Sequence, residues 1–150
     1  MNGPSFRFRL ERVRALRERH EDVAKQALAG AMAQHHRAEQ ELRAAAERVA
    51  RAREAQLEAA VGRSCANDLL ARQAYLERTE RAHQATAHDL DRQELELAQR
   101  RQALTQAARE RQALERLKER RRAEHEKETA RLEGLALDEI AMNGFRRRAA

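Results

Sequence analysis

The sequence predicts an all-α protein, a long antiparallel two-helix coiled-coil hairpin, and three observations lead to this fold class. Alanine recurs every seventh residue through the first half of the chain. Leucine recurs in the same way through the second half, and a short segment with turn-forming residues separates the halves. An average period of 3.5 residues keeps one stripe of a helix facing a partner helix, so we expect each half to be one helix and the two to pair.

The composition fits long helices better than a thick globular core. The 150-residue chain has 37% charged residues, 3% aromatic residues, one Pro and no Trp. With so few large apolar side chains, burial is expected along a narrow seam between two helices. We expect a single domain over residues 1–150, without an internal disulfide because Cys65 is the only cysteine.

The first helix is expected over residues 8–60, after a disordered lead. Its seam alternates between a small and a larger position. The small positions are Ala24, Ala31, Ala38, Ala45, Ala52 and Ala59, and the larger ones are Leu28, His35, Leu42, Val49 and Gln56. This alternation lets two helices approach closely, which favours an antiparallel partner helix.

A turn is expected at residues 61–67, where the alanine seam stops. Gly62 suits a helix end, and Ser64, Asn67 and Asp68 are three candidates for capping the next helix. With a turn near residue 64, the numbers of paired residues should add to about 128 in an antiparallel hairpin.

The second helix is expected over residues 68–141, followed by a disordered end. Neither Gly nor Pro interrupts residues 63–133. The seam positions, seven residues apart, are Leu69, Leu76, His83, Leu90, Leu97 and Leu104. About twenty residues of this helix are expected to extend beyond the start of the first.

Two basic segments, residues 1–20 and 100–131, carry the excess positive charge. The first has six Arg against two Glu, and the second has eleven basic against six acidic residues. An antiparallel hairpin brings both segments to its open end. We expect this end to bind an acidic protein surface and no nucleic acid, because aromatic stacking residues are lacking.

The sequence contains no pattern that predicts catalysis, a metal site or a cofactor site. None of the six His is spaced for metal binding, and the glycines do not form a phosphate-binding loop. The sequence therefore predicts a protein that is not an enzyme. No stretch is apolar enough to cross a membrane and no signal-peptide pattern is present, so a cytoplasmic location is expected.

Tyr75 is the candidate partner contact in the second helix. It neighbours the seam residue Leu76 and must point away from the seam, so we expect the only Tyr of the chain to be exposed near the turn. Tyr is enriched among residues that contribute most to binding at protein interfaces. The alternative explanation is a scattered surface aromatic.

Three segments resemble the FliJ family of flagellar type III export proteins. They are residues 6–13 (FRFRLERV), residues 69–76 with their aromatic residue, and residues 137–141 (LDEIA). In length and layout the resemblance covers essentially the whole chain. It implies an antiparallel two-helix coiled coil, similar to the stalk subunit of rotary ATPases and without enzymatic activity.

The resemblance also implies partners and binding residues. Family members sit in or under the hexameric ring of the export ATPase FliI, contact the cytoplasmic domain of the export gate protein FlhA and are linked to export chaperones. Through these partners they lie at the inner face of the cell membrane, at the flagellar base. The implied gate-binding residues are Tyr75, Thr79, Ala82 and Thr86, and the implied ATPase-binding residues are Arg7, Arg9, Arg14, Arg17, Arg19, Asp138 and Glu139.

Three other functions are compatible with the sequence. They are the equivalent stalk of a virulence injectisome, a nucleic-acid-associated coiled coil, and a structural homodimer whose seams pair between two chains. The first resembles a flagellar stalk closely enough that sequence alone does not separate the two.

Overall fold

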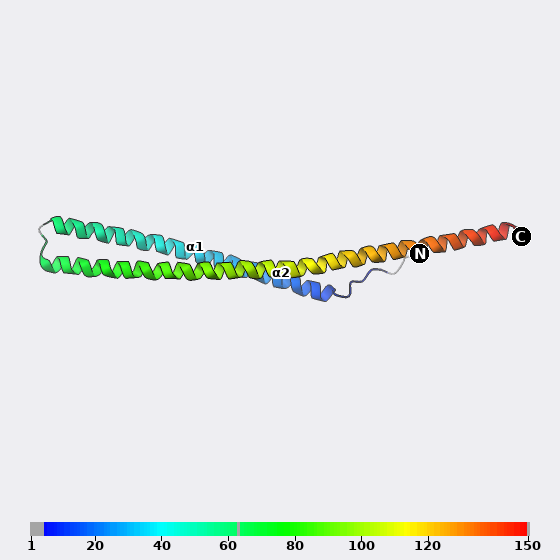
Figure 1. The fold of residues 1–150 in the computed structure, drawn as a ribbon, viewed down its shortest axis with the longest axis horizontal. Helices are drawn as coiled ribbons and strands as arrows, with labels where there is room; N and C mark the ends of the chain where they lie inside the picture. Colours follow the sequence, from blue (N-terminus) through cyan, green and yellow to red (C-terminus); the bar gives the residue numbers. More distant parts are fainter. Residues whose placement is uncertain (1–4, 63, 150) are drawn as a thin grey trace. The chain divides into compact units, whose positions relative to one another are not determined.

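The computed structural model is all-α, with two long helices that pack against each other as a hairpin (Figure 1). It describes residues 5–62 and 64–149. Helix α1 spans Glu11–Val61 and helix α2 spans Ala66–Ala149. No strand occurs among the described residues. The all-α hairpin predicted from the two repeating patterns is confirmed.

The chain divides into two compact units, and both helices contribute to each of them. The turn unit, Asp22–Thr105, contains the turn and the helical segments on either side of it. The terminal unit consists of Met1–Glu21 and Gln106–Ala150. Neither α1 nor α2 contains, over its described residues, a stretch long and apolar enough to span a membrane.

The core of the turn unit is the predicted alanine seam. Ala45 is only 1% exposed, and Val49 of α1 and Leu97 of α2 are also buried. The other buried seam residues are Ala31, Ala38, Ala52 and Ala59. Because a methyl group occupies little space, this seam gives a narrow, closely packed interface that excludes larger side chains.

The helices meet in the predicted register. The guanidinium of Arg72 donates a hydrogen bond to the carbonyl oxygen of Ala55 (3.3 Å), and Arg53 pairs with Glu80 (2.7 Å). The numbers of these partners add to 127 and 133. The other contacts between the helices fall in the same range, close to the predicted value.

The turn between the helices is shorter than predicted. The Gly62 amide donates to the Glu58 carbonyl (3.0 Å), and the Leu69 amide donates to the Cys65 carbonyl (3.2 Å). Helix α2 thus begins at Ala66, so the candidate caps Asn67 and Asp68 lie inside the helix. Asp68 lies in its first turn, where a negative charge interacts favourably with the helix dipole.

Helix α1 begins at Glu11, and the prediction of a start near residue 8 is wrong. Phe6 and Phe8 are half-buried, whereas Arg7 and Arg9 are exposed. This alternation has a period of two, which is typical of an extended segment and not of a helix. Of the predicted disordered lead, residues 1–5, the first four lie outside the described residues.

Helix α2 continues to Ala149, so the predicted helix end near residue 141 and the disordered segment after it are wrong. Gly134 and Gly144 lie inside the helix, and a Gly in a helix weakens it by about 1 kcal/mol without breaking it. Three basic residues occupy the last turn, where positive charge interacts favourably with the helix dipole.

Candidate functional site

Four ion pairs between described residues connect α1 to α2 in the terminal unit. They are Arg14–Glu115 (2.9 Å), Arg17–Glu110 (2.6 Å), Glu11–Lys118 (2.9 Å) and Glu21–Arg111. The apolar side chains beside them remain partly exposed, with Leu10 at 38%, Val13 at 41% and Leu16 at 49%. Polar contacts therefore hold the helices together here, in contrast to the alanine seam of the turn unit.

These contacts also shift the pKa values of the charged groups. Hydrogen bonds from Arg14 and then from Lys118 lower the pKa of Glu11 below its ordinary value of 4.5. The hydrogen bond to Glu21 raises the pKa of Arg111. Each shift favours the charged form, because the partner of opposite charge stabilises it.

Acid is expected to loosen the terminal unit through Glu11. Because its pKa is lower in the folded chain than in the unfolded chain, its stabilising contribution is complete above pH 4.5 and is lost as the pH falls through the folded value. Lowering the pH from 7 to about 3 should therefore reduce amide protection at residues 11–21. Hydrogen exchange followed by NMR measures this effect. A Glu11→Gln variant should lose less protection on acidification, and equal losses in both proteins would contradict the assignment.

The predicted ATPase-binding arginines fall into two groups. Arg7, Arg9 and Arg19 are exposed and form no ion pair with any described residue. Arg14 and Arg17 instead join α1 to α2. Changing either of the latter two alters the hairpin itself, so only the first group is suited to a test of partner binding.

The net charge of the chain lies entirely in the terminal unit. That unit has 18 basic and 12 acidic residues, a difference of +6, whereas the turn unit has 13 of each. Both basic segments recognised in the sequence contribute to this excess. A neutral unit and a basic unit offer different surfaces to partners, because electrostatic attraction selects an oppositely charged surface.

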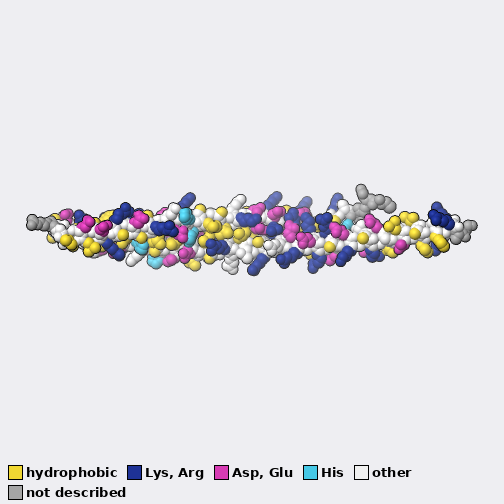
Figure 2. Space-filling model, turned by 90° about the horizontal axis from the view of Figure 1, so that it is seen from above, with side chains coloured by type: hydrophobic (Ala, Val, Ile, Leu, Met, Phe, Trp, Pro, Cys, Tyr) yellow, Lys and Arg dark blue, Asp and Glu magenta, His cyan; other side chains and the backbone are white. Residues whose placement is uncertain are grey.

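The last part of α2 has no partner helix among the described residues. Every residue from 130 to 148 is exposed, including the predicted ATPase-binding residues Asp138 and Glu139. Figure 2 shows hydrophobic side chains on the surface of this segment. The large exposed ones are Leu132, Leu135, Leu137, Ile140, Met142 and Phe145. This acidic pair is therefore placed among apolar side chains.

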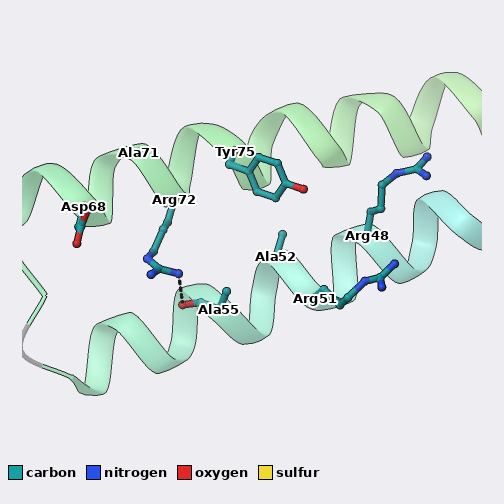
Figure 3. Close-up of a pocket in the computed structure, with 8 residues that line it drawn as sticks. All are labelled: Arg48, Arg51, Ala52, Ala55, Asp68, Ala71, Arg72 and Tyr75. Atoms are coloured by element: carbon teal, nitrogen blue, oxygen red, sulfur yellow. Dashed lines mark hydrogen bonds between the residues drawn. The ribbon is translucent and has the colours of Figure 1, made fainter.

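A groove of about 630 Å³ runs between the helices in the turn unit (Figure 3). Its lining residues are Arg48, Arg51, Ala52 and Ala55 of α1, and Asp68, Ala71, Arg72 and Tyr75 of α2. Tyr75 is 46% exposed, as expected. The expectation that it points away from the seam is wrong, because its ring extends toward α1 near the buried seam residue Ala52. The Arg78 guanidinium lies 5.6 Å from the centre of the ring, within the range of a cation–π contact.

The arginines of this groove were not singled out in the sequence. Arg48 and Arg51 share a side of α1 with Ala52 and Ala55, and this spacing of three and four residues was the available signal. The side of α2 that faces them became evident only from the pairing of the helices. The groove combines a floor of small residues with an aromatic ring and three arginines.

The four predicted gate-binding residues differ in accessibility. Ala82 is exposed like Tyr75, and Thr86 is half-buried. Thr79 is 8% exposed, and its hydroxyl donates to the Leu76 carbonyl (2.8 Å). The predicted face therefore borders α1, and Thr79 is not available to a partner in this conformation.

No group of three or more His, Cys, Asp or Glu side chains is placed to hold a metal ion within residues 5–62 and 64–149. Cys65 is exposed beside the turn.

Comparison with known proteins identifies a family. The family model described as Flagellar FliJ protein matches residues 6–150, which is nearly the whole chain. Searches of curated proteins and of solved structures found no match.

Proposed function

Because the chain belongs to the FliJ family and is thereby a component of the flagellar export apparatus, we propose that it is a stalk or adaptor between the export ATPase ring and the export gate. In this proposal it has no enzymatic activity of its own and assists chaperone-linked export. It works in the cytoplasm and reaches the inner face of the membrane at the flagellar base through its partners. The flagellar family favours this role over that of an injectisome stalk.

The observation that carries this proposal is that the two units offer unlike surfaces. The basic surface belongs to the terminal unit, and the groove beside Tyr75 belongs to the neutral turn unit. An adaptor needs separate sites for two partners, and surfaces of different charge and polarity give those sites different specificities.

We assign ATPase binding to the terminal unit and gate binding to the groove. Among the predicted arginines, Arg7, Arg9 and Arg19 form no ion pair with a described residue, and we assign them to the ATPase together with the exposed pair Asp138 and Glu139. Tyr75 and Ala82, with the groove arginines, are assigned to the gate protein. A hairpin within a symmetric ring contacts the subunits unequally, which is a means of coupling their nucleotide states to the gate.

Selective loss of each partner tests the assignment. The variant Arg7→Glu/Arg9→Glu/Arg19→Glu is expected to lose most of its binding to the ATPase, because reversed charges repel an acidic surface. Its binding to the gate domain should be unchanged. Tyr75→Ala is expected to show the opposite pattern, since exposed aromatic anchors contribute strongly to interfaces. Co-purification of the full chain with each partner measures both.

The triple reversal Arg37→Glu/Arg43→Glu/Arg101→Glu is the matched control. It makes the same change in charge at exposed residues of the turn unit that form no ion pair with described residues. If it abolishes ATPase binding equally, net charge alone accounts for the interaction. If the unaltered chain binds neither partner, the proposed function is wrong.

A further inference from the structure

We propose that a groove in the terminal unit binds an acidic protein segment that carries an apolar side chain between its carboxylates. The groove lies beside the extended lead and has a volume of about 610 Å³. Its lining residues are Arg7, Phe8, Arg9, Leu10, Leu117 and Arg121. This inference rests on the proposed function, because it specifies the chemistry of the partner segment that binds to the terminal unit.

The wall formed by the lead is held in place by contacts at both of its ends. The Phe6 ring packs against the His125 ring of α2, with 5.7 Å between their centres. The Glu11 amide donates a hydrogen bond to the Phe8 carbonyl (3.1 Å) where α1 begins. A groove with fixed walls binds a ligand at a lower entropic cost than one that must be ordered on binding.

The arginines at the rim of the groove can bind carboxylates. Arg7 and Arg9 are exposed on the lead and form no ion pair with any residue that the structure describes. Arg121 contacts Glu124 within α2 at 3.1 Å, in an exposed position. The nearby Glu11 carboxylate is already held by two basic side chains. Guanidinium groups bind carboxylates through paired hydrogen bonds, so two free arginines favour an acidic ligand.

The apolar floor of the groove favours a protein ligand over a phosphate-rich ligand. Phe8 and Leu117 are half-buried, and Leu10 is 38% exposed. A nucleic-acid backbone would contact the arginines but would have no apolar group to cover this floor. A peptide with an apolar side chain flanked by acidic residues can cover the apolar floor and pair with the arginines of the rim at the same time.

A labelled synthetic helical peptide with Leu residues flanked by Glu tests the proposal, with its Gln counterpart as a charge control. Both are titrated into the full chain, and fluorescence anisotropy reports binding. The Gln peptide, and the Arg7→Glu/Arg9→Glu variant with the Glu peptide, should each bind roughly tenfold more weakly. Phe8→Ala should also weaken binding. Arg37→Glu/Arg43→Glu should leave it unchanged, and circular dichroism checks the helix content of every variant.

Equal affinity for the two peptides, or no binding of the Glu peptide, overturns the inference. The inference is also overturned if the chain binds a DNA duplex or phosphatidylglycerol vesicles in place of the peptide and the Arg7→Glu/Arg9→Glu variant loses that binding. Binding of the ATPase distinguishes a failure of this inference from a failure of the proposed function. If the ATPase binds the unaltered chain and the Arg7→Glu/Arg9→Glu variant equally, the groove assignment fails while the function stands. If the peptide binds as expected but the ATPase does not bind, the function fails alone.

Discussion

Glutamate in place of Ala45 is expected to destabilise the hairpin severely, whereas the same change at the adjacent Ala46 is expected to have little effect. Ala45 is 1% exposed on the seam, and Ala46 is exposed. At position 45 the new side chain must separate the helices or bring an uncompensated carboxylate into the interface. The expected loss is about 3 kcal/mol in the free energy of unfolding.

Urea denaturation followed by circular dichroism measures this difference. Both variants introduce the same residue into the same turn of α1, so helix propensity and net charge are matched. The Ala46→Glu variant should remain within about 0.5 kcal/mol of the unaltered protein. Similar losses in the two variants would mean that the alanine seam does not set the distance between the helices.

Charge reversal at Arg111 is expected to open the terminal unit and leave the turn unit closed. The Glu21 side chain that Arg111 contacts is 9% exposed, so a second carboxylate placed against it is poorly screened by water. In the Arg111→Glu variant, amides of residues 11–21 should exchange at least about tenfold faster. Amides of residues 31–59 provide an internal reference that should stay unchanged.

The double variant Glu21→Arg/Arg111→Glu is the control for this prediction. It restores the opposite charges with their positions exchanged, so protection at residues 11–21 should largely return. A double variant that exchanges as fast as the single one would indicate that the two residues do not act as a pair. Hydrogen exchange followed by mass spectrometry resolves both segments in one experiment.

The two units are stabilised by different forces, which is relevant to function. Burial along the alanine seam is not screened by salt, whereas ion pairs at half-exposed positions are weak and are screened by it. The terminal unit is therefore expected to open at a lower free energy than the turn unit. In the proposed stalk, the more adaptable unit is the one that meets the ATPase.

The sequence alone determined the helical hairpin, the alanine seam and the register, because a repeat of seven residues fixes which stripe of each helix is buried. It also located the basic segments and Tyr75. It failed at both ends of the helices. The start of α1 was expected at residue 8, although Phe6 and Phe8 alternate with arginines, and the end of α2 was expected near residue 141, although the helix continues through Gly144.

Only the tertiary structure decided which charged side chains are free. In the sequence Arg9 and Arg14 look alike, but the pairing of the helices places a carboxylate beside Arg14, whereas Arg9 forms no ion pair with any residue that the structure describes. Both grooves depend on the same pairing, since each is lined from two segments that are distant in the chain. Local periodicity is set by the geometry of a single helix, whereas ion pairs and grooves arise only where a second segment packs against it.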